Sequence, residues 1–187
     1  FMSNIKKSGR LSLACDVLTK AVKAIPETER TETLAEVLED GFRSRMIYRV
    51  KEEEVDGRLS VLLERCKEAI EVIESVGLLA GSDALRIAKR FLDEQSVLSD
   101  EGKPVPKKIK DIDSNSLQSA YDEDATYRIK GNKKQSGYVL HLAETCSEEN
   151  AVQLITDYSV KPNTTSDKDI LGGRLHIIKE DTGLNGR

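Results

Sequence analysis

Tryptophan is absent from this chain of 187 residues, and aromatic residues make up only 4% of it. A buried core must therefore be built from leucine, isoleucine, valine and alanine, a composition that favours helices. Apolar residues amount to 38% and charged residues to 33%. Because the apolar positions are regularly spaced, we expect a folded protein, and the length suffices for one domain or two small ones.

Cysteine, histidine and long apolar runs are also scarce. The three cysteines, Cys15, Cys66 and Cys146, are far apart, so neither a disulfide framework nor a zinc site with the two histidines is expected. Unpaired thiols are typical of a reducing compartment, which indicates a cytoplasmic protein. No membrane span, signal peptide, P-loop, dinucleotide-binding fingerprint or serine-hydrolase motif occurs.

An overall basic excess is missing as well, since the formal net charge is -4. Binding of nucleic acid over the whole surface is therefore not indicated, although a local basic patch can still bind it.

The first half of the chain repeats apolar residues at helical spacing. Thr31 and Ser82 with Asp83 have the side chains of helix N-caps, and Gly41 and Gly77 are typical of helix ends. Helices are predicted over 11–25, 31–41, 58–76 and 83–98, and a further helix is favoured over 42–50. Residues 11–98 are thus predicted to form a bundle of about four or five helices.

Beyond residue 98 the pattern changes. Residues 99–120 contain two prolines, a glycine and many charges, which predicts a linker or extended loop. Apolar residues then alternate with a period of two, which predicts strands over 137–145 and 151–160 that form an antiparallel hairpin. A last helix is expected after Asp167 as its cap. The predicted fold class is α+β, a predominantly helical bundle plus a small antiparallel β-hairpin or sheet.

Two clusters of opposite charge precede the first predicted strand. The acidic residues 122–124 can be interpreted as ligands of Mg²⁺, because hard cations prefer carboxylate oxygens, or as a turn, in which aspartate is common. The basic cluster that follows is interpreted either as a phosphate-binding segment or as the charged edge of a soluble hairpin. Its cations are Arg128, Lys130, Lys133 and Lys134.

Five motifs occur in a fixed order: S-x-x-D-x-D-A at 119–125, the basic cluster at 128–134, Gly-Tyr at 137–138, L-I-T-D at 154–157 and a break at 165–167. This order resembles the central block of bacterial insertion-sequence transposases of the DDE type. The opening "FMSNIKKSGRLSL" is similar to the segment that follows the first catalytic aspartate of that family. The resemblance covers about residues 1–13 and 117–184.

The resemblance implies part of an RNase H-like core. Residues 1–10 would follow the first core strand, 11–98 would be a helical insertion domain, 99–120 a linker, and 121–187 the hairpin and helix of the core. The family's catalytic acids, which hold Mg²⁺ or Mn²⁺, would lie outside this sequence. We therefore expect no catalytic or metal-binding residue within the chain, which would be an inactive fragment of a DNA transposase.

The expected partner is DNA, bound weakly by Arg128, Lys130, Lys133 and Lys134. A homodimer is a further expectation, because an isolated hairpin is only marginally stable and exposes its edges. The alternative function is a non-catalytic helical interaction module that binds a protein partner.

Overall fold

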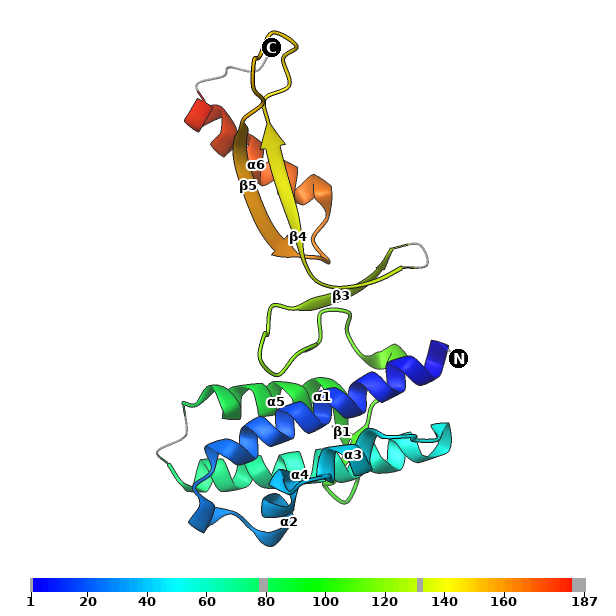
Figure 1. Ribbon diagram of the computed structural model, residues 1–187. Helices are drawn as coiled ribbons and strands as arrows, with labels where there is room; N and C mark the ends of the chain where they lie inside the picture. The colour runs from blue at the N-terminus through cyan, green and yellow to red at the C-terminus, as the bar shows by residue number, and fades with distance from the viewer. Residues whose placement is uncertain (1, 78–80, 131–132, 183–187) are drawn as a thin grey trace. The chain divides into compact units, whose positions relative to one another are not determined.

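The computed structural model describes residues 2–77, 81–130 and 133–182, but not the side chains of residues 2–8, 127, 129, 130, 133–136, 181 and 182. The chain divides into two compact units, Phe1–Glu123 and Asp124–Arg187 (Figure 1). We call them the helical unit and the β unit. The predicted α+β class is confirmed, since helices build most of the first unit and antiparallel strands with one long helix build most of the second.

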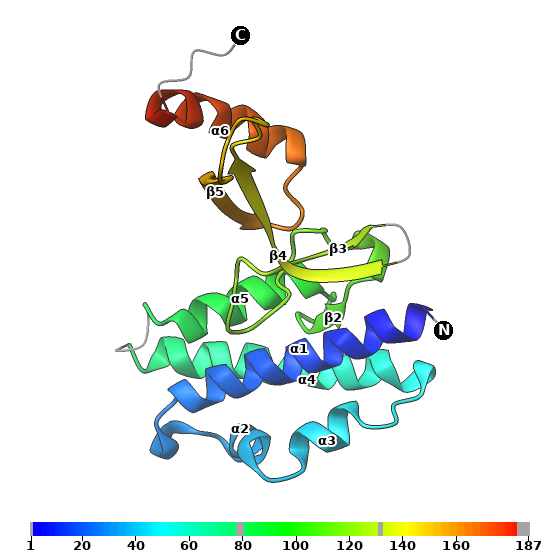
Figure 2. The ribbon, with the colours of Figure 1, turned by 45° about the horizontal axis from the view of Figure 1, so that its top comes forward.

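Three long helices form the body of the helical unit. The helices α1, α4 and α5 lie side by side, and the short segments between α1 and α4 pack against both (Figure 2). The elements are α1 (Met2–Ala24), η1 (Glu27–Glu29), α2 (Glu32–Ala35), η2 (Glu36–Leu38), α3 (Phe42–Ile47), α4 (Glu52–Ser75) and α5 (Asp83–Gln95). The helix favoured over 42–50 is therefore present in a shorter form.

Local capping signals are confirmed at the starts of α2 and α5 and at the end of α4. The helix predicted over 31–41 is instead the short α2 followed by η2, and Gly41, predicted to end it, is the N-cap of α3. The hydroxyl of Thr31 accepts a hydrogen bond from the backbone N–H of Leu34, and that of Ser82 accepts one from Leu85, each at 3.3 Å. Gly77, directly after α4, has a φ of 63°, a backbone conformation that L side chains rarely adopt. The sequence signals thus mark real helix boundaries.

Two helices are longer than predicted. The helix α1 begins at Met2, so residues 2–10 continue the helix expected over 11–25 and do not form a separate segment. The helix α4 begins at Glu52, although Gly57 interrupts its apolar pattern. Glu52–Glu54 provide the reason, because three carboxylates in the first turn interact favourably with the positive end of the helix dipole.

The expected linker is packed into the helical unit. The strand β1 (Ser96–Leu98), predicted as the end of a helix, pairs antiparallel with β2 (Pro104–Pro106), and a short turn of helix, η3 (Ile109–Asp111), follows. Further along, Leu117 and Ala120 are buried in the helical core. Residues 99–120 therefore belong to the first compact unit.

Arg10 joins this segment to α1. Its guanidinium donates hydrogen bonds to the side-chain and backbone oxygens of Gln95, at 2.9 and 3.1 Å, and to the backbone oxygen of Lys107 at 3.0 Å. Partial burial lowers the pKa of Arg10, a sign that the guanidinium has lost much of its water. Because Gln95 is almost fully buried, water cannot reach its polar atoms, and the guanidinium of Arg10 supplies their hydrogen-bond donors.

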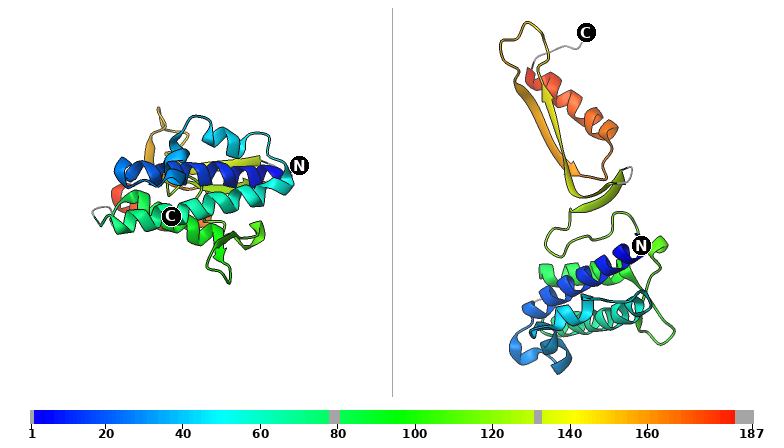
Figure 3. Two further views of the ribbon diagram at one scale, coloured as in Figure 1. Left: turned by 90° about the horizontal axis from the view of Figure 1, so that it is seen from below. Right: turned by 45° about the vertical axis from the view of Figure 1, so that its right-hand side comes forward.

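The β unit is built on one long strand that has a different partner along each half. In the sheet order β3-β4-β5, residues 133–137 pair with β3 and residues 138–144 pair with β5, all antiparallel (Figure 3). The elements are β3 (Thr126–Lys130), β4 (Lys133–Glu144), β5 (Ile155–Pro162) and α6 (Asp167–Thr182).

Gly137 forms the corner between the two halves, with a φ of 102°. Its carbonyl oxygen accepts hydrogen bonds from the backbone N–H of Asn163 at 3.1 Å and from the Thr126 hydroxyl at 3.3 Å. The Thr126 hydroxyl also lies 2.9 Å from Oδ1 of Asn163, and both side chains are buried. These contacts fix the direction in which the β3–β4 ribbon leaves the sheet.

Four details of the β unit differ from the sequence prediction. The strand β3 lies where a loop was expected, β4 covers 133–144 in place of 137–145, and β5 covers 155–162 in place of 151–160. The cap of α6 is Ser166, whose hydroxyl accepts a hydrogen bond from the backbone N–H of Asp169 at 3.2 Å, whereas Asp167 is the first residue of the helix.

Candidate nucleic-acid interface

The basic cluster predicted to bind DNA forms a two-stranded antiparallel ribbon, β3–β4. Lys130 is paired with Lys133, and Arg128 is two positions before Lys130. Because alternate positions of a strand belong to one face, these three positions share a face of the ribbon. Lys134, paired with Ile129, occupies the other face.

Arg128 is half-buried and takes part in an interaction within the chain. The side chains of Lys130, Lys133 and Lys134 lie outside the described part of the structure. The structure therefore places these four predicted residues on one ribbon by their backbone register, and the contacts of the three lysines stay predictions.

The ribbon concentrates positive charge within a chain of negative net charge. No acidic residue occurs between Asp124 and Glu144. Like charges directly opposite each other, as at Lys130 and Lys133, destabilise an antiparallel pair by roughly 0.2–1 kcal/mol. An anion bound near both lysines relieves that repulsion, and a two-stranded ribbon is one of the elements that fit the DNA major groove.

The acidic residues 122–124 lie in a turn, and Glu123 contacts α5. The carboxylate of Glu123 pairs with the guanidinium groups of Arg86 and Arg90, at 2.5 and 3.6 Å. The backbone N–H of Asp122 donates to the Ser119 hydroxyl at 3.2 Å. The hydrogen bond that Arg86 donates to the Glu123 carboxylate is the main cause of the raised pKa of Arg86. These contacts favour the interpretation of the acidic cluster as a turn.

The third acid of interest, Asp157, is paired with Arg174 of α6. The guanidinium donates through Nε to Oδ2 at 2.9 Å and through Nη2 to Oδ1. This pairing lowers the pKa of Asp157. Sequence reasoning missed both Arg174 and the arginines on α5, because partners far apart in sequence leave no local signal. The spacing of Arg86 and Arg90, one helical turn apart, is a signal from which a shared partner could have been predicted.

These carboxylates do not fit a divalent metal. Among residues whose placement is described, no group of three or more His, Cys, Asp or Glu side chains is arranged to hold an ion. Glu123 and Asp157 already pair with arginines, which would compete with a cation. The Mg²⁺ or Mn²⁺ implied by the transposase resemblance therefore has no ligand set in the part of the chain that the structure describes, and we derive no chemistry through it.

Two of the cysteine thiols are buried in the helical core. Burial raises the pKa of Cys15 to about 11 and that of Cys66 to about 12. Both stay protonated at neutral pH and lack the thiolate that nucleophilic chemistry requires.

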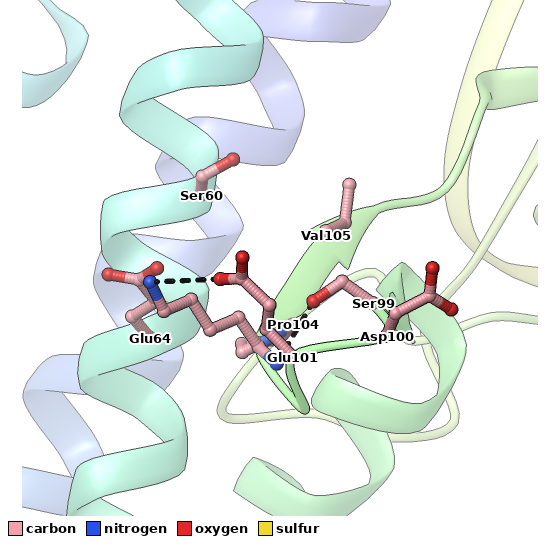
Figure 4. A pocket seen from close by; sticks show the side chains of 8 residues that line it. Ser60, Glu64, Ser99, Asp100, Glu101, Pro104 and Val105 are labelled. Carbon is pink, nitrogen blue, oxygen red and sulfur yellow. Dashed lines mark hydrogen bonds and ion pairs between the residues drawn. The ribbon is translucent and has the colours of Figure 1, made fainter.

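A shallow cavity of about 370 Å³ lies beside α4 in the helical unit (Figure 4). One wall is the turn between β1 and β2, in which the backbone N–H of Ser99 donates to the oxygen of Lys103 at 2.8 Å. The Nζ of Lys103 also lies 3.5 Å from Oε2 of Glu101. The polar groups of this turn interact with one another, so the cavity has no converging set of ligand-binding groups.

No family model matches the chain, and neither a curated protein nor a solved structure matches it. The similarity to DDE-type transposases therefore rests on the sequence motifs and stays a prediction. Within the described residues, no helix has both the length and the apolar character needed to cross a membrane.

Proposed function

We propose that this chain contacts duplex DNA through the β3–β4 ribbon and is a part of a DDE-type DNA transposase. The observation that supports the proposal is the ladder register, which brings Lys130 opposite Lys133 and puts Arg128 on the same face. These cations belong to a segment without acids. The transposase assignment is carried by the motif order and by the DNA-binding chemistry that this segment offers.

The proposed contact is electrostatic. Lysine and arginine neutralise phosphates and release condensed counterions, so the affinity falls as the salt concentration rises. With four cations engaged, the slope of log Kobs against log salt is expected to be about -3 to -4. Such binding is weak and largely independent of sequence, because phosphate contacts position a protein without reading bases.

The parent enzyme would cleave and join DNA strands with Mg²⁺ or Mn²⁺ held by acids outside this sequence. In the proposal the chain itself cleaves nothing and contributes DNA contacts in a cytoplasmic protein. Plasmid nicking by the purified chain with either metal, lost in an Asp122→Ala/Asp124→Ala variant, would show that the catalytic acids have been placed wrongly.

The binding test compares two variants of equal net charge. One replaces Arg128, Lys130, Lys133 and Lys134 with glutamine. The control replaces four exposed lysines of the helical unit with glutamine, namely Lys23, Lys51, Lys108 and Lys110. Fluorescence anisotropy with a labelled duplex is measured from 20 to 200 mM salt.

We expect the ribbon variant to lose most of its affinity and its salt slope, and the control to keep both. Equal losses in the two variants would mean that only net charge matters. A wild-type chain without measurable affinity at low salt would contradict the proposal and favour the alternative, a non-catalytic interaction module.

A further inference from the structure

One face of the β4–β5 sheet consists of exposed apolar side chains. Tyr138, Leu140 and Leu142 alternate along β4, and the ladder pairs Leu140 with Val160 and Leu142 with Tyr158. Residues paired across an antiparallel ladder point to the same side of the sheet. Between 45% and 69% of each of these five residues is exposed. We call this surface the apolar face.

The opposite side of the same sheet is covered by α6. There the alternate positions of β4 are half-buried, and Asp157 and Ser159 of β5 are 13% and 7% exposed. Asp157 pairs with Arg174 of α6, and Ile170 of that helix is buried. The β unit therefore has the helix α6 on one side of the sheet (Figure 3). The apolar face lies on the other side.

The apolar face is large for a surface that stays in water. Tyrosine has roughly 200 Å² of surface to bury, so the observed exposures correspond to an apolar patch of roughly 500 Å². This value is near the upper end for the largest patch of a monomer. None of its five residues carries a charge, so neither repulsion nor desolvation of ions opposes its burial.

We propose that a second copy of this chain covers the apolar face. A two-fold axis brings two identical uncharged faces together, so neither copy needs a complementary charge pattern on the other. The two sheets then pack about 10 Å apart with α6 outside on each copy, an arrangement of four layers in which each sheet is covered on both sides. The dimer buries roughly 1,000 Å² in total, the lower bound for a specific interface.

This association uses the face of the sheet and not its edge. The inference is independent of DNA, because none of the four ribbon cations belongs to the apolar face. If the proposed DNA contact also holds, each dimer carries two β3–β4 ribbons, and simultaneous engagement raises the apparent affinity by a factor of about 100 or more.

The test measures the mass of the full chain by sedimentation across a range of protein concentrations. We expect the wild type to approach twice the chain mass of 20.8 kDa as the concentration rises. A Leu140→Asp variant puts a charge in the apolar face, so we expect its dimer dissociation constant to rise about 30-fold or more. The control, Leu171→Asp, adds the same charge on an exposed position of α6 and should leave the constant unchanged.

A second readout distinguishes a second copy from other occupants. Since the chain has no tryptophan, a Tyr158→Trp variant reports on the apolar face alone. Its emission should be blue-shifted at high concentration and move to the red on dilution, in step with dissociation. Blue-shifted emission in a monomer would mean that the chain covers its own face. Red emission at every concentration, or a dimer insensitive to Leu140→Asp, would likewise overturn the proposal, whether or not the chain binds DNA.

Discussion

The helical unit and the β unit treat their apolar residues in opposite ways. In the helical unit, Leu18, Leu59, Leu62 and Phe91 are fully buried within one continuous core. In the β unit, Ile170 is the buried large apolar side chain among the described residues, whereas one whole face of the β4–β5 sheet is exposed. The first unit therefore has a complete buried core, whereas the second leaves one apolar face of its sheet uncovered.

The difference follows from layer geometry. Three long helices can each turn an apolar stripe toward the other two, so a bundle closes by itself. The β4–β5 part of the sheet has two faces, and α6 covers only one of them. Small sheets of this kind are marginally stable in water unless a second layer packs on them. Measurements that follow the stability of each unit by itself therefore test this difference directly.

The largest effect is expected from truncating a leucine in each unit. Leu62→Ala removes a side chain that is fully buried and should destabilise the helical unit by about 2–5 kcal/mol, through lost burial and the cavity left behind. The matched Leu140→Ala removes a side chain that is 58% exposed. In protein dilute enough to be monomeric, it should change stability by less than about 0.5 kcal/mol.

The stability of the Leu62→Ala variant is measured by urea denaturation, followed by the helical signal in circular dichroism. The stability of the Leu140→Ala variant is measured by hydrogen exchange of peptides from β4. Equal destabilisation by the two alanines in the monomer would mean that the apolar face is packed within a single chain, and the contrast between the units would not hold.

The next largest effect is expected at low pH, where the two units should lose stability at different pH values. Asp157 has a lowered pKa because Arg174 hydrogen-bonds its charged form. Its contribution to stability is therefore complete above the unfolded value of about 3.9 and is lost as pH falls through the lower folded value. Glu36 of the helical unit is held similarly by Arg65, but the buried core there is independent of this pair.

Below about pH 4, hydrogen-exchange protection of β5 should therefore decline before that of α4. Asp157→Asn should remove most of this pH dependence. The control is Glu148→Gln, a change at an exposed position of the same unit. Simultaneous loss of protection in both units would indicate that they unfold together.

The helical unit could be predicted from sequence because its signals are local. Thr31, Ser82 and Gly77 each act within one turn of helix, and apolar spacing identified the buried faces. The start of α4 was missed because Gly57 interrupts the pattern, although the glutamates that precede it favour a helix start. Residues 2–10 were assigned from the transposase resemblance, and their helix was therefore not anticipated.

The β unit was harder because strand pairing connects distant residues. The strand β3 carries Arg128 and Lys130 and has no strong apolar alternation of its own; its pairing with β4 gives it strand structure. The basic residues were identified as a charge cluster, but their register across a ribbon needed the fold. The same holds for the partners of Glu123 and Asp157, which lie on helices far away in the sequence.

Removal of a helix N-cap should have a smaller effect on stability, of similar size in the two units. Ser82 caps α5 and Ser166 caps α6 through equivalent hydrogen bonds, of 3.3 and 3.2 Å. Loss of such a cap costs about 1 kcal/mol wherever the helix lies. Ser82→Ala and Ser166→Ala, followed by hydrogen exchange of α5 and α6, should give similar losses. A much larger loss for α6 would show that this helix depends on its cap more than on packing against the sheet.

The smallest expected effect concerns the like-charged pair of the ribbon. Lys130→Gln removes the repulsion across the ladder to Lys133 and should stabilise β3–β4 by about 0.2–1 kcal/mol at low salt. The gain should vanish near 1 M salt, where the Debye length is about 3 Å. Lys108→Gln in the helical unit is the control and should change nothing. Polyphosphate should protect the wild-type ribbon from hydrogen exchange more than the Lys130→Gln ribbon, because it relieves the same repulsion. A ribbon that Lys130→Gln destabilises would show that this lysine already has a stabilising partner within the chain, and the DNA contact would then have to displace it.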